Sequence, residues 1–128
     1  MNANSLAGCK ILVIDDDADN LDLLTFILKA SQAEVKAVRA TAEVITALSQ
    51  EPFDVLISDI AMPDEDGYSL LRRVRNLAYG TQIPVIALTA FAKEEDRQRA
   101  IAAGFRAYLV KPIDPDQVVT TVRAVIQQ

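Results

Sequence analysis

The stretch KILVIDD at residues 10–16 is the clearest indication of the fold. A short run that is apolar through its middle ends abruptly in two aspartates. Apolar runs of this length, without alternating polar residues, suit strands that helices cover on both faces of a parallel sheet. Two later runs, at 55–57 and 85–88, have the same character. We therefore expect these three strands to lie in the interior of one parallel sheet.

Two further runs carry charge and suit the edges of that sheet. Residues 35–39 mix charged and β-branched side chains, and residues 105–110 include Arg106. Charged side chains are common on edge strands. Amphipathic segments separate the five runs, and this alternation predicts an α/β fold. The expected helices lie near 18–30, 42–50, 67–77, 94–103 and 115–126.

Two helix ends carry clear signals. Asp114 and Pro115 suit the start of the last helix, where an aspartate caps and a proline fits the first turn. Gly104 suits the end of the fourth helix in a left-handed conformation. We expect residues 1–128 to form a single domain, with residues 1–8 as a flexible N-terminal lead.

Composition excludes several classes of protein. The 128 residues contain no histidine, which removes Ser-His-Asp and Cys-His catalysis and imidazole metal ligands. The net charge of -5 opposes direct binding to nucleic acid. No run is long and apolar enough for a membrane span, and residues 1–8 do not resemble a signal peptide. Cys9 is the single cysteine, expected as a small buried residue, so a cytoplasmic protein is expected.

Polar residues follow four of the five expected strands. Asp15 and Asp16 come after the first, Asp59 after the third, Thr89 after the fourth and Lys111 after the fifth. Open parallel sheets bind their ligands at this carboxyl edge. An aspartate pair before a helix is also a common N-terminal cap, and Thr89 or Lys111 alone would be unremarkable. It is the joint pattern that indicates a site.

Three carboxylates at one edge would repel one another unless a cation lay between them. Oxygen ligands without His or Cys suit Mg²⁺, which commonly bridges carboxylates and a phosphate oxygen. Lys111 can pair with a phosphate oxygen and the Thr89 hydroxyl can donate to another. Asp59 is the best candidate for a nucleophile that accepts a phosphoryl group, because it stands alone before the turn-rich loop 62–67.

The ordered set of these motifs resembles the receiver domain of two-component response regulators, as in CheY-like proteins. The matching residues span essentially the whole chain. They are Ile11 to Asp16, Ser58-Asp59, Met62-Pro63 with Gly67, Leu88-Thr89-Ala90 and Lys111-Pro112. The resemblance implies a flavodoxin-like, doubly wound sheet with strand order 2-1-3-4-5, and phosphorylation of Asp59 by a phospho-His.

The resemblance also implies how the cation is held. Asp16, Asp59 and the Ala61 carbonyl would ligate Mg²⁺ directly, while Asp15 would act through water. Thr89 and Ala90 would contact the phosphoryl group together with Lys111. The bond before Pro112 would be a cis peptide that helps to aim the lysine.

Thr89 and Tyr108 match a pair that carries the phosphorylation signal in the family. The hydroxyl would move toward the phosphoryl group and the ring would change its exposure. The alternative for Tyr108 is an edge-strand aromatic packed only for area. The partner surface would comprise the helix at 94–103, the strand at 105–110 and the helix at 115–126, which is also a surface for a homodimer. The phosphodonor would be a sensor histidine kinase or a His phosphotransfer protein in another chain or domain.

Two positions bear on how long the signal lasts. Ala61 and Phe91 should flank the approach of hydrolytic water, and neither can orient a water by hydrogen bonding. The sequence therefore predicts slow autodephosphorylation.

Two other functions fit parts of the pattern. A phosphatase of the haloacid dehalogenase type also uses an Asp nucleophile, but it needs a second Asp at the position of Ala61. A phosphorylation-independent binding module would be expected to lack Asp59, Thr89 or Lys111, and all three are present. The favoured function is a regulatory domain rather than a metabolic enzyme. A free-standing regulator and the receiver part of a hybrid kinase both fit.

Overall fold

The structure is a computed structural model and describes residues 5–127. Five strands and five helices alternate along them, so the expected α/β class is confirmed. The strands are β1 (Lys10–Ile14), β2 (Glu34–Val38), β3 (Val55–Asp59), β4 (Val85–Thr89) and β5 (Ala107–Val110). The helices are α1 (Ala18–Ala30), α2 (Thr41–Gln50), α3 (Gly67–Val74), α4 (Glu94–Ala103) and α5 (Pro115–Ile126).

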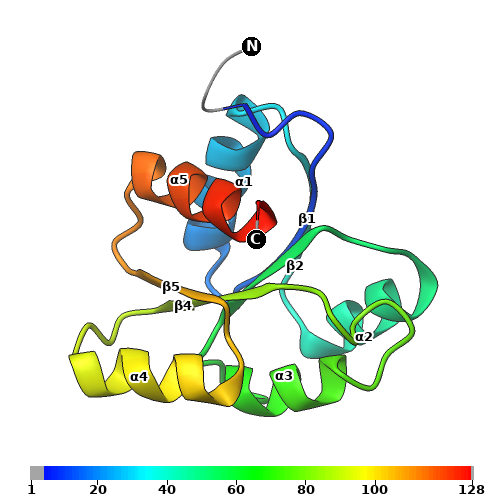
Figure 1. Ribbon diagram of the computed structural model, residues 1–128, viewed down its shortest axis with the longest axis vertical. Coiled ribbons are helices and arrows are strands. Elements are labelled where there is room, and N and C mark those ends of the chain that lie inside the picture. The colour runs from blue at the N-terminus through cyan, green and yellow to red at the C-terminus, as the bar shows by residue number, and fades with distance from the viewer. Residues whose placement is uncertain (1–4, 128) are drawn as a thin grey trace.

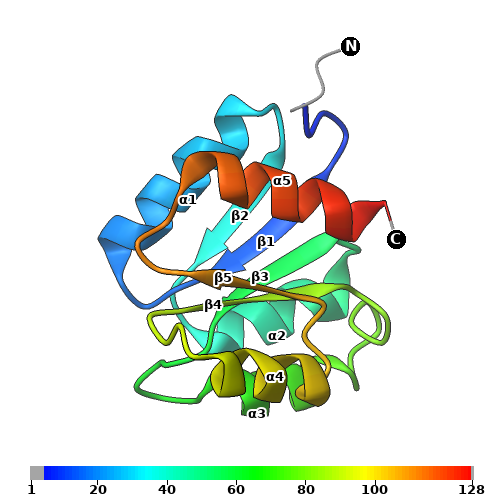
Figure 2. The same ribbon diagram turned by 60° about the vertical axis from the view of Figure 1, so that its left-hand side comes forward.

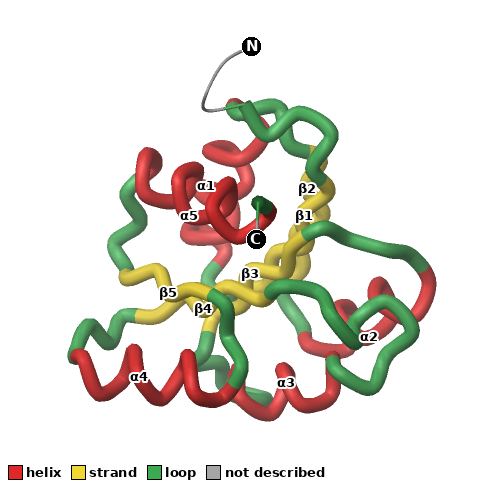
Figure 3. Tube along the Cα trace, in the orientation of Figure 1, coloured by secondary structure: helices red, strands yellow, loops and turns green. Residues whose placement is uncertain are grey.

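The strands form one parallel sheet in the order β2-β1-β3-β4-β5. The expected strand order, the three interior strands and the two edges are therefore confirmed. Helices α1 and α5 cover one face of the sheet, and α2, α3 and α4 cover the other (Figures 1 and 2). Figure 3 shows the same layers, with the loops at the two ends of the strands.

The interior strands are apolar through their middles because both faces of the sheet are covered. On β1, Ile11 and Val13 belong to the apolar layer beneath α1 and α5, while Leu12 and Ile14 belong to the layer above α2, α3 and α4. All four side chains are fully buried. Each contributes on the order of 1.5–3 kcal/mol relative to exposure.

Aspartates cap three of the helices. The side chains of Asp17, Asp66 and Asp114 accept hydrogen bonds from backbone N–H groups in the first turns of α1, α3 and α5. Gly104 ends α4 with φ of 115°, the left-handed conformation expected from the sequence. The side chains that cap are thus distinct from Asp15 and Asp16.

Helix α3 is shorter than the sequence predicts. The expected helix at 67–77 ends at Val74, and the prediction is wrong for the last three residues. There, bonds to the third residue back replace the α-helical pattern, as Leu77 N–H donates to the Val74 carbonyl at 3.0 Å. The Arg75 guanidinium donates to the carbonyls of Gly80 and Ile83 and folds the following loop against the helix end. These partners are backbone carbonyls of the loop after the helix, and the periodicity of apolar side chains does not report on them.

The N-terminal residues that the structure describes pack against the domain. Leu6 is buried, and its N–H donates to the Ser31 carbonyl at 2.6 Å. Arg123 on α5 donates to the Ser5 carbonyl at 2.8 Å. The expectation of a flexible lead thus does not hold at Leu6, because burial of its apolar side chain anchors it, and residues 1–4 lie outside the described part. None of the helices within 5–127 has the length and apolar character that a bilayer span requires.

Candidate phosphoacceptor site

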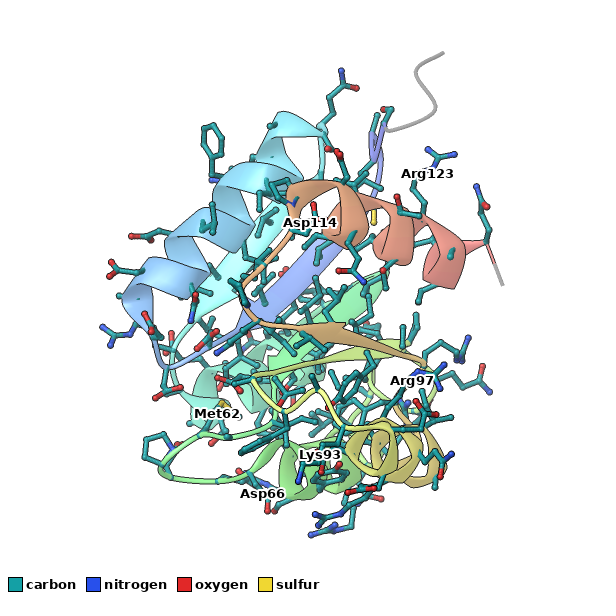
Figure 4. The ribbon with its side chains drawn as sticks, turned by 90° about the vertical axis from the view of Figure 1, so that its left-hand side faces the viewer. Met62, Asp66, Lys93, Arg97, Asp114 and Arg123 are labelled. Carbon is teal, nitrogen blue, oxygen red and sulfur yellow. The ribbon has the colours of Figure 1, made fainter. Side chains whose placement is uncertain are left out.

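The carboxyl edge of the sheet brings together the polar residues that the sequence singles out. Asp59 and Thr89 are the last residues of β3 and β4, while Asp15 and Lys111 directly follow β1 and β5. Asp15, Asp59 and Thr89 are buried, although their side chains are polar. In Figure 4, Met62 and Asp114, which follow β3 and β5, lie at this same edge on opposite faces of the sheet.

Lys111 joins two of the carboxylates. Its Nζ lies 3.0 Å from Asp59 Oδ2 and 3.1 Å from Asp15 Oδ2. Burial acts to lower the pKa of Lys111, but its contacts with Asp59 and Asp15 outweigh this and raise the pKa. The ammonium group therefore stays charged beside Asp59. The Lys111–Pro112 peptide bond is cis.

Asp59 is a buried carboxylate with an altered pKa. Burial raises the pKa of Asp59 to about 6, and the charge of Asp15 adds to this, while Lys111 opposes it. The Ala61 N–H donates to Oδ1 at 3.0 Å, so both oxygens have partners on the protein. The Ser58 hydroxyl donates to the Asp59 carbonyl at 3.0 Å and fixes the backbone at the strand end.

The three aspartates can hold a cation together. Asp15, Asp16 and Asp59 each offer one oxygen, and these oxygens lie within 4.8 Å of one another. Asp15 Oδ1 accepts from the Asp17 N–H at 2.9 Å, whereas the buried Oδ2 has the Lys111 ammonium at 3.1 Å as its one partner among the described residues. A buried carboxylate oxygen with a single cationic partner has a lone pair left for a metal ion or its water. Mg²⁺ prefers such oxygen ligands.

The loop between β3 and α3 is held closed from both ends. Gly67 N–H donates to the Ile60 carbonyl at 2.7 Å. A Cβ on Gly67 would lie 2.8 Å from the Ile60 Cα and 2.9 Å from the Asp59 carbonyl oxygen, so only glycine fits. This closure fixes Ala61, which lies exposed within the loop.

Glu65 anchors the same loop to α3. Its carboxylate accepts from the Ser69 hydroxyl and pairs with Arg73, and its side chain is only 14% exposed. Burial acts to raise the pKa of Glu65, but the bonds to Ser69 and Arg73 outweigh it and lower the pKa. Glu65 is therefore a paired acid rather than a solvated one. Ser69 and Arg73 follow it by four and eight residues, a helical spacing that could have revealed them.

Arg39 is a second residue that sequence reasoning missed. It follows β2 at the carboxyl edge, and its Nη2 donates to the Asp16 carbonyl at 2.9 Å. This bond ties the loop after β1 to the neighbouring strand. Its position directly after an edge strand was the signal in the sequence that could have identified Arg39 as a residue of the site.

A chain of contacts leads from the site to the surface. The Thr89 hydroxyl accepts from the Phe91 N–H at 3.1 Å, and the Tyr108 hydroxyl donates to the Phe91 carbonyl. Burial, and then the charge of Asp96, raise the pKa of Tyr108, so its hydroxyl keeps the proton that it donates. Thr89, Phe91 and Tyr108 also line a small cavity of about 170 Å³. Ala90 and Phe91 are exposed at the rim of the site.

Together, the doubly wound sheet and the buried acid cluster with its lysine define an α/β domain whose carboxyl edge could hold a cation. The model of the response regulator receiver domain matches residues 11–123. The chain therefore belongs to the response regulator receiver domain family. Its strand order agrees with the resemblance found in the sequence.

Relatives of this chain include a protein of similar length and a protein about twice as long. An uncharacterized 14.6 kDa protein in the sodA1 3' region of Leptolyngbya boryana is 46% identical, over 93% of this chain and 91% of that protein. The transcriptional regulatory protein GltR of Pseudomonas aeruginosa is 34% identical over 100% of this chain, which spans only 52% of GltR.

Solved structures share the fold. The receiver domain of a sensor histidine kinase from Pseudomonas aeruginosa, solved with a magnesium ion coordinated in its active site cleft, has a TM-score of 0.85 and 29% identity. The match covers 95% of this chain and 100% of that structure. Response regulators and histidine kinases thus both contain domains similar to this one.

Proposed function

We propose that this domain is the phosphoacceptor of a two-component system and that Asp59 takes the phosphoryl group. The observation that carries this proposal is the place of Asp59, buried at a strand end with Lys111 Nζ 3.0 Å from its Oδ2. The donor is a phospho-His on a sensor histidine kinase or a phosphotransfer protein. The chain contains no histidine, so the donor lies outside it.

The reaction forms a mixed anhydride on Asp59. A carboxylate oxygen attacks phosphorus, the P–N bond of the phospho-His breaks, and its electron pair leaves with the imidazole. Lys111 then pairs with a phosphoryl oxygen in place of a carboxylate. The Thr89 hydroxyl donates to a second oxygen, assisted by the exposed backbone at Ala90.

We propose Mg²⁺ as the cation, held by Asp16, Asp59 and the Ala61 carbonyl, with Asp15 acting through water. When bound, Mg²⁺ supplies positive charge that offsets the carboxylates and the phosphoryl group. The clustering of three carboxylate oxygens beside a single lysine supports this set of ligands.

The phosphoryl group alters the surface through Thr89 and Tyr108. When Thr89 turns its hydroxyl toward the phosphoryl group, it gives up the bond from the Phe91 N–H. The Phe91 carbonyl also accepts the Tyr108 hydroxyl, so movement of this segment changes where the ring can lie. The surface formed by α4, β5 and α5 then differs between the two states and binds the partner.

We also propose a regulatory role without a turnover substrate, and a cytoplasmic location. The chemistry is confined to the chain's own Asp59. The single cysteine is unpaired and buried, which suits a reducing compartment. The net charge of -5 argues against nucleic acid as a direct partner.

Incubation with Mg²⁺ and acetyl phosphate, followed by intact mass measurement, tests the proposal. The parent should gain the mass of one phosphoryl group, and Asp59→Asn should gain none. Asp22→Asn is the matched control, since Asp22 is exposed on α1 and should not alter the gain. No gain on the parent, or an equal gain on Asp59→Asn, would refute the proposal.

A further inference from the structure

Helix α1 exposes a large apolar surface to water. Phe26 is 71% exposed and Leu23 is 43% exposed. Both border a groove of about 490 Å³ between α1 and α5, whose apolar lining includes Ile27 and Val119. Helices α1 and α5 lie side by side on one face of the sheet (Figures 1 and 2). A contiguous apolar surface of this kind marks an interface.

Charged residues lie on both sides of Phe26 along the helix. Asp22 is four residues before Phe26 and Lys29 is three residues after it, and all three are exposed. Residues at these spacings share one face of an α-helix. Neither Asp22 nor Lys29 forms an ion pair with any residue in the described range 5–127. We call the exposed residues Asp22, Leu23, Phe26, Lys29 and Ala30 the α1 face.

We propose that the α1 face binds the α1 face of a second copy of this chain, with the two helices antiparallel about a twofold axis near Phe26. In this arrangement a residue four before Phe26 faces a residue three or four after it on the other helix. Asp22 therefore meets Lys29 of the partner subunit, and the symmetry forms this ion pair twice. The surface is self-complementary, as a twofold dimer requires.

The groove completes the apolar part of this contact. Phe26 lines the groove on its own subunit, and in the proposed dimer each ring packs against the ring and groove of the other copy. A central aromatic ring with charged pairs at the rim is the usual arrangement of an interface. Helix α4 itself offers the smaller Ile101, 42% exposed, while Phe91, 58% exposed, lies in the loop before it. The homodimer expected through α4, β5 and α5 is thus the competing arrangement.

Analytical ultracentrifugation of the 128-residue chain, from about 1 to 500 μM, tests the proposal in the concentration range of weak interfaces. The mass should rise from 14.0 kDa toward twice that value. Phe26→Asp should raise the dimer dissociation constant by at least about tenfold. Ile101→Asp, the matched change on α4, should leave it unchanged. Circular dichroism checks that each exposed substitution leaves the fold intact.

Charge reversal provides an independent test. Asp22→Lys and Lys29→Asp should each weaken the dimer, because each places like charges opposite one another. The double variant restores opposite charges and should restore the dimer to within a few-fold of the parent. A chain that is monomeric throughout, a dimer insensitive to Phe26→Asp, one abolished by Ile101→Asp, or a double variant no better than the singles would overturn the proposal.

A different occupant would also be detected. If the parent is monomeric and Phe26→Asp instead slows phosphoryl transfer from a phosphotransfer protein, the α1 face binds that protein and the dimer is refuted. The dimer does not depend on phosphorylation, so Asp59→Asn should dimerise like the parent. Failure of one proposal therefore leaves the other standing.

Discussion

Asp59 and Lys111 show how single residues at this site depend on one another. Each is at least partly buried, and each would be costly to bury as a charge alone. Together they satisfy one another at 3.0 Å, and Asp15 adds a second negative charge beside the lysine. Two carboxylates thus face a single ammonium group, and the remaining negative charge favours the binding of a further cation.

Cys9 should behave as a buried neutral thiol. Burial, and then the charge of Asp54, raise the pKa of Cys9 from 9.0 to about 11. The unfolded chain therefore loses the proton first, and the stability that Cys9 contributes is full below about pH 9 and is lost as the pH rises toward 11. Urea unfolding at about pH 8 and pH 10.5 should show a decline on the order of 1–2 kcal/mol. Cys9→Ala is the control, and an equal decline in that variant would contradict the assignment.

The lifetime of the phosphoryl group should depend on Ala61 and Phe91. Neither side chain can hydrogen-bond the water that attacks the acyl phosphate, and Phe91 is exposed at the rim of the site. Ala61→Asn and Phe91→Glu should each shorten the lifetime by about 3-fold to 10-fold or more, because each introduces a polar side chain that can position the attacking water. Loss of mass from the phosphorylated protein measures the rate. Variants no faster than the parent would disprove the role of these two positions.

At the scale of elements, the loop between β3 and α3 carries the proposed Ala61 ligand. Its ends are joined by the bond from Gly67 to Ile60, and Glu65 ties it to Arg73 and Ser69 on α3. The loop is thus fixed before any ligand binds. A site built in this way does not have to order its loop when the cation arrives.

Gly67→Ala should therefore damage both stability and the site. The added Cβ would meet backbone atoms of Ile60 and Asp59 at 2.8 and 2.9 Å, and one of them must move. We expect a loss of about 1–3 kcal/mol in the free energy of unfolding. Mg²⁺ affinity and the rate of phosphorylation should fall as well.

Gly8→Ala is the matched control for this change. Gly8 has φ of 82° but no atom within 4 Å of an added Cβ, and it precedes β1 at the opposite edge of the sheet. It should lose about 1 kcal/mol from backbone strain and retain Mg²⁺ binding. If both variants bind Mg²⁺ like the parent, the loop does not set the site.

At the scale of the whole molecule, the fold concentrates charge at one edge. Five parallel strands place Asp15, Asp16 and Asp59 within reach of one cation. Repulsion among them lowers the stability of the protein without a cation. The apolar side chains that the two helical layers bury on both faces of the sheet offset this loss of stability.

Magnesium should therefore stabilise the whole domain. At about one hundred times the dissociation constant, Mg²⁺ should add about 2.7 kcal/mol to the free energy of unfolding. Asp59→Asn should be more stable than the parent without Mg²⁺ and should gain less from it, because one repelling charge and one ligand are gone. Thermal unfolding with and without Mg²⁺ measures both effects.

Asp22→Asn provides the control for general effects of the salt. Asp22 lies on the exposed face of α1, away from the cluster, so this variant should gain as much from Mg²⁺ as the parent. Equal gains in Asp59→Asn and the parent would show that Mg²⁺ acts elsewhere.

The sequence by itself determined the α/β class, the five strands and the residues at their ends. Unbroken apolar runs at 11–14 and 85–88 require cover on both faces, and an interior strand of a parallel sheet provides it. Because parallel strands end at one edge, the polar residues after them had to converge. The family resemblance supplied the strand order.

Only the tertiary structure decided how those residues are held. Arg39 reaches the loop after β1 from the end of a neighbouring strand. The end of α3 was also decided by contacts outside the helix, since Arg75 bonds to backbone carbonyls of the loop that follows. Sequence periodicity reports which face of an element is apolar, whereas these hydrogen bonds depend on where other elements bring their backbone. For the same reason, the exposure of Phe26 beside a groove became apparent only when α5 lay next to α1.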